Sequence, residues 1–101
     1  MGVGLTPHLL STDIIMYWVY IIKSKKNNSL YIGSTPDLEK RIKEHNDGKS
    51  LFTKKYKPWI LVYTEGYFLK EDALYREKSL KYFGKVYAQL KRRIRNSLLS
   101  A

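Results

Sequence analysis

Trp18-Val19-Tyr20-Ile21-Ile22 and Leu30-Tyr31-Ile32-Gly33-Ser34 are the two stretches of sequence that decide the predicted fold. Each is a short apolar run rich in β-branched and aromatic residues, which is typical of a β-strand. The polar segment 23–29 between them is short enough to connect two antiparallel strands. The two stretches therefore predict a β-hairpin in which each strand carries a tyrosine.

The turn of this hairpin determines which side chains share a face. Asn27 and Asn28 are the candidate central turn residues, because asparagine adopts positive φ at low cost. That turn would pair Ser24 with Tyr31. Since side chains alternate between faces with a period of two, Tyr20 and Tyr31 would lie on the same face, and a slip of one residue would separate them.

The composition describes one folded domain. The chain has 101 residues, of which 44% are hydrophobic and 14% aromatic, which favours a packed globule over a disordered basic tail. Cysteine is absent, so disulfides and thiolate metal sites are excluded and a cytoplasmic location is expected. No apolar run approaches the roughly 20 residues that span a bilayer, so we expect no membrane partner.

The charge is strongly positive. Nineteen lysines and arginines against nine acidic residues give a net charge of +10 and a pI near 9.8. Nucleic acid is the first partner to consider, because each phosphate that is neutralised releases condensed counterions. An anionic membrane surface or simple solubility is the alternative explanation.

The chain divides into three parts. Residues 1–15 contain two glycines and a proline without a sustained period, so we expect a poorly ordered N-terminal extension. Met16 directly precedes the first predicted strand and is a candidate natural start. We expect the folded domain to span residues 16–96 and residues 97–101 to form a C-terminal tail.

The first predicted helix follows the hairpin. Thr35 is the candidate N-cap, Pro36 the first helical residue and Gly48 the end. One helical face would contain Leu38, Arg41, Ile42 and His45. The pattern therefore places an arginine on or beside the buried stripe.

The remaining elements complete a small sheet covered by helices. Residues 59–64 are almost continuously apolar, which fits a central strand that ends at Gly66. A helix over 69–83 would hold Glu77 at the edge of its buried face, and a last helix has a basic side at Lys91–Arg95. The order β-β-α-β-α-α predicts an α+β fold with a three-stranded sheet.

Five side chains could carry chemistry, although each has an ordinary structural explanation. Tyr20 and Tyr31 could be core rings, Arg41 a salt-bridge partner, Glu77 a paired carboxylate at the core edge and His45 a helix cap. Together they supply what metal-assisted phosphodiester cleavage needs. Arginine grips phosphate bidentately, a carboxylate suits Mg²⁺, and a tyrosine with a depressed pKa can act as a base.

Lysines near these residues are candidate nucleic-acid contacts, with an ordinary solvated surface as the alternative. They lie on the first predicted helix and in the connector that follows it. These residues are Lys40, Lys43, Lys54, Lys55 and Lys57.

Four ordered blocks of the sequence resemble the GIY-YIG nuclease domain, and more narrowly its small stand-alone bacterial members of otherwise unassigned role. The blocks are Trp18-Val19-Tyr20, Tyr31-Ile32-Gly33, Asp37–Arg41 with His45-Asn46, and Ala73–Glu77. The resemblance covers roughly residues 16–94. It implies a three-stranded antiparallel sheet flanked by helices, and an endonuclease that uses one divalent cation, Mg²⁺ or Mn²⁺, to hydrolyse nucleic-acid phosphodiesters.

The resemblance also implies roles for individual residues. Tyr20 would be the general base for the attacking water, and Tyr31 would position water and phosphate. Arg41 would clamp the phosphate, Glu77 would bind the metal, and Gly33 would permit close backbone approach.

Further positions match the family more loosely. His45 falls at a family position of supporting role, and Lys54 is the candidate for a central His or Lys found in some members. Trp18 stands where the motif has its first glycine, and no Asn-containing closing motif follows. No separate DNA-reading segment accompanies the domain, so we expect weak sequence specificity, structure selectivity or a protein partner that supplies specificity, with DNA favoured over RNA.

Two other functions are compatible with the sequence. The chain could be a nucleic-acid-binding module that keeps the nuclease fold with little or no turnover. It could also be an interaction protein that uses the basic surface around Lys91–Arg95.

Overall fold

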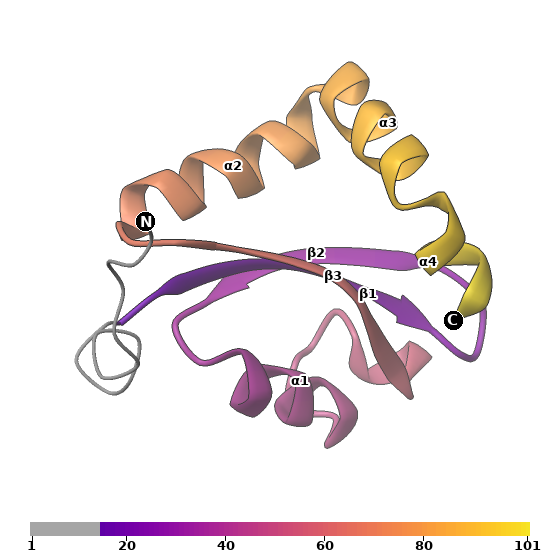
Figure 1. The fold of residues 1–101 in the computed structure, drawn as a ribbon. Coiled ribbons are helices and arrows are strands. Elements are labelled where there is room, and N and C mark those ends of the chain that lie inside the picture. Colours follow the sequence, from indigo (N-terminus) through magenta and orange to yellow (C-terminus); the bar gives the residue numbers. More distant parts are fainter. Residues whose placement is uncertain (1–14) are drawn as a thin grey trace, which may run out of the picture.

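The protein is an α+β domain, described here by a computed structural model of residues 15–101. Its elements are β1 (Tyr17–Ser24), β2 (Leu30–Thr35), α1 (Leu38–Asn46), the 3₁₀ turn η2 (Lys54–Tyr56), β3 (Trp59–Tyr67), α2 (Lys70–Tyr82), α3 (Gly84–Arg93) and α4 (Arg95–Ser100). The predicted order and the three-stranded antiparallel sheet are confirmed. Helix α1 lies on one face of the sheet, and α2 and α3 lie on the other (Figure 1). The expected N-terminal extension falls almost entirely on residues 1–14, outside the described part.

The central strand is β1, in the order β2-β1-β3. The prediction that residues 59–64 form the central strand is therefore wrong. Val19–Ile22 in β1 are all buried, whereas Ile60 and Leu61 in β3 are 37% and 38% exposed. A nearly continuous apolar run fits both positions, and the run in β1 is the one covered on both faces.

The hairpin register differs from the predicted one by two residues. Ile22, rather than Ser24, lies opposite Tyr31, and Tyr20 lies opposite Gly33. The connection is longer than two residues because the Ser24 side chain accepts hydrogen bonds from the backbone of the turn, and Asn28 carries the positive φ of 64°. A shift of two keeps every side chain on its face, so Tyr20 and Tyr31 share a face as predicted.

Alternation along β1 divides the interior into two layers. The layer under α2 and α3 contains Val19, Ile21, Ile32, Ala73, Leu80 and Leu90. The layer on the α1 side is smaller and contains Tyr20, Ile22 and Trp59, with Tyr31, Leu38 and Ile42 packed against it. The two hairpin tyrosines therefore belong to the smaller layer.

Helix α1 begins two residues later than predicted. Asp37, not Thr35, is the N-cap, and its carboxylate accepts a hydrogen bond from the Lys40 backbone at 3.1 Å. Thr35 still pairs with Trp18 as the last residue of β2. Gly48, with φ of 77°, follows the end of α1 as expected.

Strand β3 continues through Gly66, where the sequence predicted its end. Gly66 pairs with Trp18, and a Cβ atom at Gly66 would lie 2.8 Å from Cζ3 of the indole ring. Gly66 therefore makes room for an aromatic ring from the neighbouring strand, and it does not end β3.

The C-terminal residues form an element that the sequence did not indicate. Helix α4 includes most of residues 97–101, and Lys23 Nζ on β1 donates hydrogen bonds to the carbonyl oxygens of Leu98 (2.7 Å) and Ala101 (3.3 Å). None of the helices within residues 15–101 has the length and apolar character needed to cross a membrane.

Candidate active site

A buried hydrogen-bonded pair lies between the sheet and α1. The Tyr20 hydroxyl is 2.8 Å from Nε2 of His45, and both residues are at most 1% exposed. Nδ1 of His45 is 2.7 Å from the hydroxyl of Thr53, which is also buried. The indole of Trp59 donates a hydrogen bond to the Thr53 carbonyl at 2.8 Å. These bonds hold the imidazole in one orientation.

Burial shifts the acidity of the two partners in opposite directions. Burial raises the pKa of Tyr20 to about 12, and the nearby Arg41 guanidinium opposes that rise. Burial lowers the pKa of His45 to about 4, and the positive charge of Arg41 adds to the effect. At neutral pH the pair is therefore a phenol beside a neutral imidazole, which retains one nitrogen lone pair as an acceptor.

Gly33 creates the space that Tyr20 occupies. It lies directly opposite Tyr20 in the β1–β2 ladder. A Cβ atom at Gly33 would lie 2.6 Å from Cζ of the tyrosine ring, closer than side chains pack. Glycine at this position therefore lets the ring lie across β2.

Tyr31 connects the pair to helix α2. Its ring packs edge-on against the His45 ring, with centroids 5.2 Å apart. On its other side, Lys81 Nζ lies 5.9 Å from the centroid of the Tyr31 ring. Lys81 Nζ also donates to Oε2 of Glu77 at 2.6 Å, while the Ser34 hydroxyl donates to Oε1 at 2.5 Å. The carboxylate from α2 thus reaches the edge of β2.

Arg41 lies on α1 beside the buried pair. Its guanidinium is partly exposed and forms an ion pair with Glu44 at 3.0 Å. It is close enough to lower the pKa values of both Tyr20 and His45. Tyr31 and Glu77 have the opposite effect on Tyr20 and raise its pKa. The structure therefore gathers the five predicted side chains, which are Tyr20, Tyr31, Arg41, His45 and Glu77, around the β2 edge.

Three supporting residues were not predicted from the sequence. Ser34 follows Gly33 directly and Lys81 lies one helical turn after Glu77, so their spacing from motif residues was an available signal. No signal in the sequence pointed to Thr53, because its contact with His45 depends on how the segment between α1 and β3 folds back onto α1.

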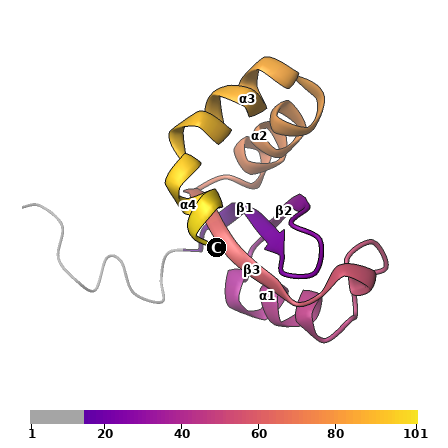
Figure 2. The same cartoon turned by 90° about the vertical axis from the view of Figure 1, so that its right-hand side faces the viewer.

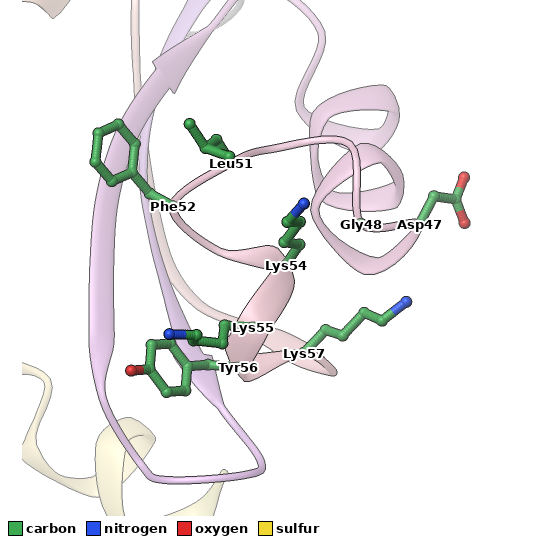
Figure 3. Close-up of a pocket in the computed structure, with 8 residues that line it drawn as sticks. All are labelled: Asp47, Gly48, Leu51, Phe52, Lys54, Lys55, Tyr56 and Lys57. Atoms are coloured by element: carbon green, nitrogen blue, oxygen red, sulfur yellow. The ribbon is translucent and has the colours of Figure 1, made fainter.

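None of the candidate nucleic-acid lysines forms one of the hydrogen bonds, ion pairs or ring contacts described for this cluster. Lys40 and Lys43 are exposed on α1, and Lys43 pairs with Asp47 at 2.8 Å. Lys54, Lys55 and Lys57 line an open hollow of about 740 Å³ next to the end of α1 (Figure 3). The hollow and the cluster are connected through Thr53, which immediately precedes Lys54.

Comparison with known proteins identifies the domain to which most of the chain belongs. Residues 16–85 match the GIY-YIG catalytic domain. A UPF0213 protein of Staphylococcus haemolyticus is 44% identical over 70 residues, covering 68% of this chain and 84% of the relative. The UPF0213 protein YazA of Bacillus subtilis is 41% identical over 66 residues, or 64% and 66% of the two chains.

A solved structure is also similar. The solution NMR structure of a UPF0213 protein from Bacillus halodurans is 33% identical and covers 85% of this chain and 84% of its own, with a TM-score of 0.44. The domain match alone spans most of the sequence. The chain therefore belongs to the GIY-YIG family.

Proposed function

We propose that this protein is a divalent-metal-dependent endonuclease that hydrolyses nucleic-acid phosphodiesters. The observation that supports the proposal most is the convergence of Tyr20, His45, Arg41, Tyr31 and Glu77 from β1, β2, α1 and α2. No single element brings these residues together, and an ordinary core would not need all of these polar groups at one edge of a sheet.

Tyr20 and His45 would accept the proton that the attacking water loses. A tyrosine with a pKa near 12 is a poor base on its own at neutral pH. With Nε2 of the neutral imidazole as acceptor, the Tyr20 oxygen can take a proton from water while its own proton passes to His45. The hydroxyl of Thr53 fixes the imidazole for this transfer.

Arg41 would bind the phosphate that is attacked. Its guanidinium is permanently charged and partly exposed, so a phosphate oxygen can reach it and replace the present ion pair with Glu44. Tyr31 would then position the water and phosphate with its hydroxyl. Both residues would stabilise the negative charge that develops on the phosphate oxygens in the transition state.

The oxygen donors around Glu77 suit Mg²⁺ or Mn²⁺. Within residues 15–101 there is no group of three or more acidic or histidine side chains that could hold a metal, so the cation would keep several water and substrate oxygens. Glu77 would be the protein ligand, with the Ser34 hydroxyl orienting the carboxylate. The cation would supply positive charge to the developing oxyanion and leaving group.

The positive charge of the protein suggests a nucleic-acid substrate that is recognised with weak sequence specificity or by its structure. A net charge of +10 favours binding to the phosphates of a nucleic acid, whatever its base sequence. DNA is favoured over RNA, a protein partner could add specificity, and the absence of cysteine fits action in the cytoplasm.

One observation favours a second function, which is nucleic-acid binding without turnover. Both oxygens of Glu77 already accept hydrogen bonds, one from Ser34 and one from Lys81. If Lys81 is not displaced, its positive charge disfavours a cation at Glu77, and nucleic-acid binding would be salt-sensitive but without cleavage.

A cleavage assay separates the two functions. The full chain is incubated with supercoiled plasmid, single-stranded DNA and branched DNA in Mg²⁺ or Mn²⁺. Glu77→Gln and Arg41→Ala should each slow cleavage about 10²-fold or more, since a preorganised charge at the transition state is worth about 3 kcal/mol. Glu71→Gln, an exposed acid on the same helix, is the matched control and should cleave normally. Cleavage that survives both site substitutions, or no cleavage of any substrate by the unaltered protein, contradicts the nuclease proposal.

A further inference from the structure

Two large apolar side chains stand in solvent where the connector folds back toward the site. Leu51 and Phe52 are 75% and 80% exposed. Their neighbours Ser50 and Thr53 are polar but only 8% and 0% exposed. This segment reverses the usual preference, in which apolar side chains are buried and polar ones face water. Adjacent exposed apolar side chains of this size are available for contact with a ligand.

The exposure does not come from a loose loop. The Thr53 and Lys54 backbone amides both donate to the Ser50 carbonyl, at 3.2 and 3.0 Å, which closes a tight turn around the two exposed residues. The Thr53 side chain bonds to His45, and the Ser24 hydroxyl donates to the Tyr56 carbonyl at 2.5 Å. The base of the segment is therefore fixed, and its apolar tip, Leu51-Phe52, faces solvent.

The surface next to the tip is positive. Residues 47–57 contain four lysines and one acid, Asp47, for a net charge of +3. Lys43 from α1 pairs with Asp47 and lowers its pKa. A Cβ atom at Gly48 would lie 3.4 Å from Lys57 Nζ, which shows how closely this lysine covers the end of α1. Figure 3 shows the tip and Lys54, Lys55 and Lys57 around the same hollow.

We propose that the tip is a base-stacking contact: the Phe52 ring packs on an unpaired nucleobase whose flanking phosphates lie on the lysines of the hollow. This inference rests on the proposed function for its class of ligand. An exposed aromatic ring beside a positively charged track is the combination by which proteins bind single strands, and each stacked base contributes substantially to affinity. Two apolar residues are too small a surface to hold a membrane, and an apolar protein partner would not need the lysines.

The tip also has a fixed position relative to the site. Thr53 follows Phe52 directly, its hydroxyl bonds to His45, and His45 bonds to Tyr20. In Figure 2 the segment lies at the margin of the molecule, beyond the β1–β2 hairpin. In a regular duplex the bases are stacked on each other and are inaccessible to Phe52, so the tip favours substrates with an unpaired nucleotide near the cleaved bond.

The test measures binding by the full chain carrying Glu77→Gln, so that any cleavage is slow compared with the measurement. Phe52→Ala and Phe52→Trp are compared with Phe68→Ala, which removes another phenylalanine that is 72% exposed but lies outside the hollow. The ligands are a single-stranded oligonucleotide with one 2-aminopurine and the same sequence as a duplex. Fluorescence anisotropy gives the affinities, and quenching of 2-aminopurine reports stacking.

Phe52→Ala should weaken single-strand binding about tenfold and abolish the quenching, with duplex binding changed less than twofold. Phe52→Trp should restore both, and Phe68→Ala should change neither. Equal losses on both ligands, or no loss at all with Phe52→Ala, would overturn the stacking proposal while leaving the nuclease proposal intact. If the parent protein binds no nucleic acid even at low salt, both proposals fail.

Discussion

The Tyr20 hydroxyl and Nε2 of His45 lie 2.8 Å apart, and the two side chains are almost completely buried. Burial raises the pKa of the tyrosine to about 12 and lowers that of the histidine to about 4. The two groups therefore keep the same protonation state over a wide range of pH. A relay that starts from a phenol and a neutral imidazole is available throughout that range.

The pH dependence of cleavage follows from this pair. The proposed relay requires a neutral His45, so kcat/KM should remain flat from pH 8 down to about pH 5 and fall only as the pH approaches 4. A histidine with an ordinary pKa would give a fall centred near 6.5. Single-turnover cleavage at constant metal ion and ionic strength measures the profile, and a midpoint near 6.5 would show that His45 does not titrate as its environment requires.

Stability should also depend on His45. Its pKa is lower in the folded protein than the ordinary 6.5, so the unfolded chain binds more protons between about pH 6.5 and 4. The contribution is complete above pH 6.5, and the free energy of unfolding falls as the pH drops toward 4, by about 3 kcal/mol at most. Urea denaturation at pH 7 and pH 4.5 measures the change. His45→Gln should reduce it, and an unchanged pH dependence in that variant would assign the effect to other groups.

Gly33→Ala should damage the site through Tyr20. The added methyl group meets the tyrosine ring, which has buried neighbours on its other side and cannot move without losing its bond to His45. We expect a loss of about 1–3 kcal/mol in unfolding free energy, as for other overpacked cores, and at least tenfold slower cleavage. Gly84→Ala is the control, because no atom lies within 4 Å of a Cβ atom there. Equal behaviour of the two variants would contradict the packing argument.

Lys81→Met should strengthen metal binding. Lys81 would compete with the proposed cation for Glu77, and a partly exposed ion pair contributes about 0.2–1 kcal/mol. Its removal should therefore increase Mn²⁺ affinity by about two- to fivefold, measured by calorimetry on the full chain. Lys78→Met removes an exposed charge from the same helix without an ion pair to Glu77 and is the control. A weaker Mn²⁺ affinity in Lys81→Met would mean that Lys81 supports the metal site instead of competing for it.

Much of the fold was predictable because local patterns and tertiary packing agree. The apolar runs, the helical stripe containing Arg41 and the glycine after α1 each specify an element without help from the rest of the chain. The shared face of Tyr20 and Tyr31 was predicted correctly despite a register error of two, since only the parity of the register matters for the face.

The errors occurred where side chains distant in sequence decide the outcome. The Trp18 ring packs over Gly66, and β3 continues through this glycine, where the sequence predicted the end of the strand. The Ser24 hydroxyl lengthens the hairpin turn, and Thr35 stays in β2 because it pairs with Trp18. Thr53 reaches His45 only because the connector folds back. None of these contacts produces a periodic signal in the sequence.

The packing of α2 on the sheet also affects how relatives of this protein should be judged. Ala73 and Leu80 are fully buried on the same helix as Glu77, four residues before it and three residues after it. A larger residue at Ala73 would lift α2 from the sheet and carry Glu77 away from Ser34, although every motif residue would remain. Under the proposed nuclease function, a substitution at this core alanine would be enough to abolish catalysis, so a search for competent relatives should score that position together with the motif.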